Sequence, residues 1–223
     1  METQLGRGCR PTVEMSGRFV PDGVKYALVT LVVGAVAAVR WPLAAVAGAL
    51  ASAFTLWFFR DPERRPAPTG VASPADGRVS VVREEGDRLR VGVYMSALDV
   101  HVNRAPLDGT VRSVTHRDGA NRPAFSKDSE RNERVRIGFD DHEVVLIAGW
   151  FARRIHPWVS VGDTVDRGDR IGHIAFGSRA DVVFPPAVTR EDLVVEVGDR
   201  VYAGRTALAC PAGDGGVEPG ASE

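Results

Sequence analysis

The sequence predicts a mainly β protein that is preceded by an apolar helical hairpin. The chain is almost wholly apolar from Tyr26 to Phe59, and after Pro66-Ala67-Pro68 it changes to short β-branched runs separated by Gly, Pro and Asp. No long amphipathic helical pattern follows. We therefore expect an N-terminal tail (1–23), a membrane-associated hairpin (24–60), one β-rich domain (61–210) and a disordered, acidic tail (211–223).

The apolar stretch is interrupted at Arg40-Trp41-Pro42, where a charge, an interfacial aromatic and a helix breaker meet. We expect helices over Tyr26–Val39 and Pro42–Phe59, about 21 Å and 27 Å long at about 1.5 Å per residue. Both are shorter than a hydrocarbon core of about 30 Å, so the hairpin either spans a membrane or re-enters it with Arg40 reaching the headgroups.

Basic residues flank both ends of the hairpin: Arg18, Lys25, Arg60, Arg64 and Arg65. The positive-inside bias then predicts a protein at the cell membrane whose β domain faces the cytoplasm. A secretory signal peptide is the first alternative, but the stretch is long and lacks a small-residue cleavage site. A buried hairpin of a soluble protein is the second, and it would need a larger domain to cover it.

Composition limits the function classes. The 223 residues are 44% hydrophobic, which is enough for a core, and the formal net charge of -1 argues against a nucleic-acid partner. Cys9 and Cys210 lie near opposite ends and form no ligand cluster, so neither a disulfide framework nor a zinc site is indicated, and we expect no metal.

Two sequence repeats refine the β domain. Pro74-Ala-Asp-Gly-Arg-Val79 is echoed at Pro106-Leu-Asp-Gly-Thr-Val111, and Val161–Gly168 is echoed at Val197–Gly204. If each Asp-Gly strand pairs with one Gly-Asp hairpin, the domain resembles two barrel-sandwich units of the biotinyl/lipoyl kind, nested in sequence. Ordinary reuse of Gly-Asp turns is the alternative. Neither hairpin tip carries a lysine, so a swinging-arm carrier is not expected.

The candidate reactive residue is Ser178, in Phe176-Gly177-Ser178 between two β-type runs. Gly177 leaves its own carbonyl unshielded, so the Ser178 hydroxyl can attack it. Elimination of the resulting ester gives dehydroalanine, which water hydrolyses to ammonia and a pyruvoyl group. This chemistry needs a base. His101 is the best candidate because a neutral imidazole suits proton transfer near pH 7, and Asp76 could orient its other ring nitrogen.

Several motifs occur together in one order. They are Phe59-Arg-Asp-Pro-Glu-Arg64, Ser73-Pro-Ala-Asp-Gly77, Met95-Ser-Ala-Leu-Asp-Val-His-Val-Asn-Arg-Ala-Pro106, Asn132-Glu-Arg134, Ala152-Arg-Arg-Ile155 and Phe176-Gly-Ser178. This pattern resembles the short form of phosphatidylserine decarboxylase, a group that includes archaeal relatives acting on archaetidylserine. The resemblance runs from about Lys25 to Cys210 and so covers most of the chain.

The resemblance implies that Asp76, His101 and Ser178 form a self-processing triad. Cleavage between Gly177 and Ser178 would leave a large β chain and a short α chain, held together as a heterodimer and, as is typical of the family, in a higher homo-oligomer. The pyruvoyl group from Ser178 would bind the serine headgroup of a membrane phospholipid as a Schiff base and accept electrons as carbon dioxide leaves.

One departure concerns Arg104, which stands where longer family members carry a second histidine. Arg104 could contact a substrate phosphate or carboxylate, and Arg153 and Arg154 are further candidates for binding lipid phosphate. Two other functions remain open: a membrane-tethered, non-enzymatic adaptor, which predicts an intact chain, and a pyruvoyl decarboxylase of a soluble amino acid. The sequence does not decide between ester-linked and ether-linked lipids.

Overall fold

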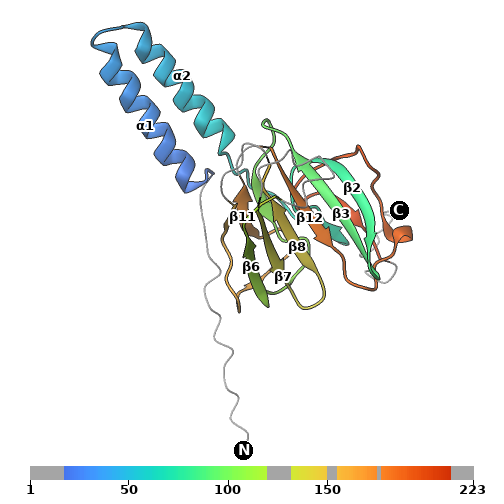
Figure 1. The fold of residues 1–223 in the computed structure, drawn as a ribbon. Helices are drawn as coiled ribbons and strands as arrows, with labels where there is room; N and C mark the ends of the chain where they lie inside the picture. The colour runs from blue at the N-terminus through green and yellow to red at the C-terminus, as the bar shows by residue number, and fades with distance from the viewer. Residues whose placement is uncertain (1–17, 120–131, 150–154, 175–176, 212–223) are drawn as a thin grey trace, which may run out of the picture.

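A computed structural model describes residues 18–119, 132–149, 155–174 and 177–211. In these ranges the chain forms a helical hairpin that stands out from a β body (Figure 1). The expectation of a mainly β protein with an N-terminal apolar helix pair is therefore confirmed.

The hairpin consists of α1 (Pro21–Ala38) and α2 (Leu43–Phe58). Helix α1 begins five residues before the expected Tyr26, because Pro21 suits the first helical turn and Asp22 favours the positive end of the helix dipole. The two helices approach most closely at Gly34 and Gly48, where a Cβ on Gly34 would lie 2.7 Å from the Gly48 Cα. Small residues allow this close packing of apolar helices.

The β body is built from antiparallel pairings. The largest sheet has the order β13-β2-β3-β12-β8-β7-β6, and a second sheet has the order β4-β11-β9. Short pairs join β1 to β14 and β5 to β10. The strands are β1 (Val71–Ala72), β2 (Gly77–Glu85), β3 (Arg88–Met95), β4 (Val102–Arg104), β5 (Gly109–Thr110), β6 (Ser113–Arg117), β7 (Arg134–Gly138), β8 (Glu143–Ile147), β9 (Ile155–Pro157), β10 (Thr164–Val165), β11 (Arg170–Ile174), β12 (Ser178–Val183), β13 (Arg200–Val201) and β14 (Ala207–Ala209).

The sequence repeats pair as nested units. Strand β5 of the second Asp-Gly motif pairs with β10 of the first Gly-Asp hairpin, and β2 of the first motif pairs with β13 of the second hairpin. The turn contacts also repeat: the amide of Gly162 donates to the Val111 carbonyl at 2.9 Å, and that of Gly198 donates to the Val79 carbonyl at 2.8 Å. The outer pair of motifs therefore encloses the inner pair in sequence, in keeping with the order of two Asp-Gly motifs followed by two Gly-Asp motifs.

Two apolar clusters hold the molecule together. The main core lies between the sheets and contains the buried side chains of Met95, Leu146, Ile171 and Phe184. A smaller cluster joins the base of the hairpin to the β body, and its members are Val20, Phe58, Phe59, Val100 and Val102, with Trp158 packed against them. The hairpin thus contacts the β body next to the start of β4.

Candidate active site

Ser178 is the first residue of β12, in the middle of the largest sheet, with Met95 at the end of β3 as its strand partner. Two connections meet here, since residues 96–101 lead from β3 to β4 and residues 175–177 lead from β11 to β12. The amide of Ile174 donates to the His101 carbonyl at 3.2 Å, so the ends of both connections are linked. The fold therefore brings the segments of Ser178 and His101 together.

The Ser178 hydroxyl is buried without a described hydrogen bond. Its residue is 0% exposed, and its Oγ has no hydrogen-bond partner among the described residues. A buried hydroxyl without a partner is costly and calls for a functional explanation. Gly177 precedes it with φ of +61°, a left-handed conformation that favours glycine. Phe176 lies outside the described residues.

His101 is buried beneath the end of the hairpin. Its ring stacks on the Phe58 ring with centroids 4.5 Å apart, and neither ring nitrogen has a hydrogen-bond partner within the described ranges. Burial lowers the pKa of His101 to about 4, and the nearby Asp99 carboxylate offsets only part of that effect. The imidazole is therefore neutral near pH 7.

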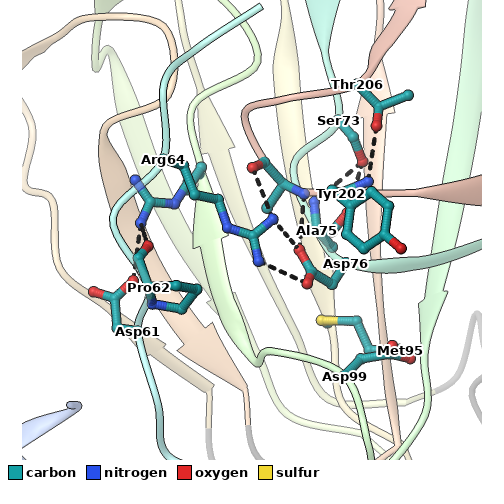
Figure 2. Close-up of polar contacts among 12 residues, drawn as sticks. Asp61, Pro62, Arg64, Ser73, Ala75, Asp76, Met95, Asp99, Tyr202 and Thr206 are labelled. Atoms are coloured by element: carbon teal, nitrogen blue, oxygen red, sulfur yellow. Dashed lines mark hydrogen bonds and ion pairs between the residues drawn. The ribbon is translucent and has the colours of Figure 1, made fainter. Parts of the chain in front are cut away.

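Asp76 does not orient His101, contrary to the hydrogen bond expected from the sequence. Its carboxylate pairs with both terminal nitrogens of Arg64, at 2.7 Å and 2.8 Å, and accepts the amide of Ala203 at 2.9 Å (Figure 2). The arginine is the stronger partner because a bidentate guanidinium satisfies both oxygens. Asp76 nonetheless lies close to the site, since a Cβ on the next residue, Gly77, would be 3.3 Å from the Met95 Cα.

Arg104, a candidate for binding a substrate anion, is paired inside the protein. Its guanidinium is buried, donates to Asp61 at 2.9 Å, and also donates to the carbonyls of Gly168 and Pro62 at 2.9 Å and 3.1 Å. Burial lowers the pKa of Arg104, although Asp61 opposes the shift. An internal carboxylate therefore occupies the guanidinium that was expected to contact a substrate phosphate or carboxylate. Arg153 and Arg154 lie outside the described residues.

Sequence reasoning missed the structural role of Phe59-Arg-Asp-Pro-Glu-Arg64. Asp61 is buried and bridges Arg104 to Arg170, while Arg64 holds Asp76. The segment therefore ties the end of the hairpin to the loops around the candidate site. The signal in the sequence was an Asp directly before Pro62 and flanked by arginines, but it did not identify the partners, which lie far along the chain.

Asp99 was also missed as a neighbour of His101. Its carboxylate accepts the amide and hydroxyl of Ser96 at 2.8 Å and 2.7 Å and pairs with Arg200. The Ser96-x-x-Asp99 spacing is typical of a side chain that closes a turn, which could have predicted these contacts. The turn fixes the path of the chain from β3 to His101.

A buried serine behind a left-handed glycine, with a neutral histidine on the adjoining connection, is the arrangement of a candidate self-processing site. Comparison with known proteins agrees with this class, since a model of the family described as phosphatidylserine decarboxylase matches residues 51–209. The chain belongs to the phosphatidylserine decarboxylase family.

Individual relatives are similar over most of their length. A Halobacterium salinarum protein, provisionally named as an archaetidylserine decarboxylase proenzyme, is 57% identical over 83% of this chain and 95% of its own. A Streptomyces avermitilis protein named phosphatidylserine decarboxylase proenzyme is 51% identical over 78% of this chain and 80% of its own. A Streptomyces griseus protein of the same name is 50% identical over 76% of this chain and 80% of its own.

Proposed function

We propose that this protein decarboxylates a serine phospholipid with a pyruvoyl group that it makes from Ser178 by cutting itself after Gly177. The names of its relatives support the reaction and the proenzyme state. The observation that carries the site is the Ser178 hydroxyl, which is buried without a described partner directly after a left-handed glycine. His101 supplies the neutral imidazole that the reaction needs.

Self-cleavage begins at the Ser178 hydroxyl. The Ser178 Oγ attacks the Gly177 carbonyl carbon while a base accepts the hydroxyl proton, and the peptide C–N bond breaks to give an ester and a free amino group. A base then removes the Ser178 Cα proton, and the Gly177 carboxylate leaves from Cβ. Water hydrolyses the resulting dehydroalanine to a pyruvoyl group and ammonia. His101 is our candidate for both proton transfers.

The residues present fit this group, because Ser178 already lies in a buried position with no described hydrogen bond to be broken. A pyruvoyl group supplies a carbonyl that can bind an amine and accept the electron pair left by departing carbon dioxide. His101 would hold and return the proton at the substrate Cα. Asp76 keeps a positioning role in the proposal through Gly77, which packs against the partner strand of Ser178.

The two chains produced by cleavage would remain bound to each other. The new α chain would begin at Ser178, and its first strand, β12, is hydrogen-bonded on both sides, to β3 and to β8. Both neighbours belong to the β chain. Hydrogen bonding of β12 on both sides supports a stable heterodimer after cleavage. Assembly into a higher homo-oligomer remains a proposal from the family.

The exposed apolar surface of the hairpin supports the proposal that the substrate is a lipid. Its large apolar side chains point outward, including Val36, Trp41, Leu43 and Leu50, which are 69%, 68%, 81% and 66% exposed. Helix α1 is long and apolar enough to cross a membrane, whereas the 16-residue α2 is shorter. We propose a cell-membrane location with the β body facing the cytoplasm, and lipid phosphate near Arg153 and Arg154.

The nested pairing of β5 with β10 and of β2 with β13 supports two barrel-sandwich units within one catalytic domain. We retain the division into a tail (1–23), a hairpin (24–60), a catalytic domain (61–210) and a C-terminal tail (211–223). The helix start at Pro21 moves the first boundary slightly toward the N-terminus.

Intact mass spectrometry of the purified protein tests the cleavage. We expect two chains, with the second starting at a blocked Ser178, and a single intact chain for Ser178→Ala together with complete loss of decarboxylation. Ser113→Ala, on the edge strand β6, is the control and should be cleaved normally. A single chain of about 24 kDa from the wild type would instead favour the non-enzymatic adaptor.

A double variant at the hairpin tip, Trp41→Ser with Leu43→Ser, tests the substrate. Both side chains are exposed, so self-cleavage should be unchanged while turnover of phosphatidylserine or archaetidylserine in vesicles falls. Supplying each lipid in turn decides between ester-linked and ether-linked chains. Turnover of free serine at an equal rate by both forms would favour a soluble amino acid as substrate.

A further inference from the structure

A second cluster of reactive side chains lies at the foot of the hairpin. His156 of β9 and His173 of β11 are direct partners across the three-stranded sheet. Their rings stack with centroids 4.7 Å apart and planes inclined by 7°. Cross-strand partners project on the same face of a sheet, so both imidazoles face the hairpin. Neither histidine has a part in the proposed self-cleavage.

Asp22 completes the cluster from another element. It stands in the first turn of α1, and one side-chain donor atom from each of Asp22, His156 and His173 lies within 4.8 Å of the other two. One Asp22 oxygen also accepts the Lys25 ammonium at 3.2 Å, an exposed pair within one helical turn. Such a pair is weak, so it does not prevent the carboxylate from binding a stronger cation.

The strongest sign of a missing ligand is at His173. This residue is 3% exposed, and its Nδ1 has no hydrogen-bond partner among the residues that the structure describes. Trp158 and Phe59 cover the ring, with centroids at 5.3 Å and 6.4 Å. A buried nitrogen in an aromatic surround is costly when nothing binds it.

We propose that Asp22, His156 and His173 bind a divalent transition-metal ion of the zinc class, which joins α1 to the β body. Two imidazoles and one carboxylate are a common zinc ligand set that leaves a fourth position for water. Tetrahedral bonds of about 2.0–2.1 Å place donor atoms about 3.3 Å apart, so the present donors need to approach one another by at most about 1.5 Å. Rotation of the half-buried Asp22 and His156 side chains provides that movement.

The site differs from the expectation of no metal, which rested on the absence of a cysteine cluster. It is also separate from the proposed self-processing site, since Ser178, His101 and Asp76 are not among the three proposed ligands. A bound ion would restrict the movement of the hairpin relative to the β body. A metal ion bound to one helix and two strands adds a link beside the small apolar cluster at the hairpin base, and so fixes the hairpin over His101.

Calorimetric titration with zinc chloride tests the site, using the full-length, self-cleaved protein in detergent after removal of metals by a chelator. We expect one zinc ion per chain. His156→Ala and Asp22→Asn should each weaken binding at least about tenfold, because each removes one of three ligands. His116→Ala is the matched control, since His116 is a half-exposed histidine that pairs with Glu133 far from this cluster, and it should bind zinc as the wild type does.

Thermal unfolding gives a second readout that does not depend on activity. Zinc should raise the melting temperature of the wild type and of His116→Ala but not that of Asp22→Asn, which replaces a half-buried side chain with one of the same shape and should fold normally. The proposal is overturned if the wild type binds no zinc at about 100 μM, or if Asp22→Asn and His156→Ala bind it as tightly as the wild type.

Discussion

The low pKa of His101 predicts a self-cleavage rate that does not fall in weak acid. An ordinary histidine with pKa 6.5 would be about 9% neutral at pH 5.5, whereas a pKa of about 4 leaves it about 97% neutral. If the neutral imidazole is the base, cleavage at pH 5.5 should proceed at nearly the rate seen at pH 7.5. An ordinary histidine would slow cleavage about tenfold over the same pH range.

Removing the aromatic cover tests the cause of this shift. Phe58 stacks directly on His101 and is 1% exposed, so Phe58→Ala should admit water, raise the His101 pKa toward 6.5 and make cleavage slow in acid. The control is Phe54→Ala, one helical turn away, since Phe54 contacts Phe58 but is 54% exposed. It should retain the flat pH profile.

The assay is cell-free synthesis followed by transfer to buffers between pH 5 and pH 7.5, with the two chains separated on denaturing gels at timed intervals. A wild-type rate that drops about tenfold between pH 7.5 and pH 5.5 would refute the reasoning, because His101 would then titrate as an exposed histidine. An unchanged profile for Phe58→Ala would show that the hairpin does not set the basicity of His101.

Three further variants test the framework of the site. Asp61→Asn should lower the free energy of unfolding by about 3–5 kcal/mol in denaturant titrations, because it leaves the buried Arg104 without a charge partner. Gly34→Leu should force the helices apart at Gly48 and speed amide hydrogen exchange in α2. Gly177→Ala should fold but cleave slowly in the timed gel assay, since the methyl group shields the carbonyl and disfavours φ of +61°.

Each variant has a matched control. Asp140→Asn breaks an exposed ion pair with Arg112 and should leave the unfolding midpoint almost unchanged. Val33→Leu adds bulk to the outer face of α1 and should not affect exchange. Gly86→Ala places a methyl at φ of +67° with nothing within 4 Å, so it reproduces the backbone strain of Gly177→Ala without touching cleavage. Equal effects of a variant and its control would contradict the corresponding argument.

Local patterns in the sequence were enough to predict the apolar hairpin and the mainly β body. The apolar run predicted the hairpin, because helix composition and breakers such as Pro42 act over a few residues. The Asp-Gly and Gly-Asp motifs predicted the nested pairing, because turn chemistry is local and the repeats occur in matching order. Gly177-Ser178 was predicted as the cleavage site for a similar reason, since the proposed reaction needs those two residues next to each other.

Only the tertiary structure decided the partners of the charged and aromatic side chains. Asp76 pairs with Arg64 and not with His101. Arg104 pairs with Asp61, which lies 43 residues away in the sequence. The stacking of Phe58 on His101 likewise depends on where the hairpin docks. Pairing between distant residues follows from the path of the whole chain and from competition among buried charges. A single sequence therefore singled out Ser178 as the candidate reactive serine, while the fold determined what surrounds it.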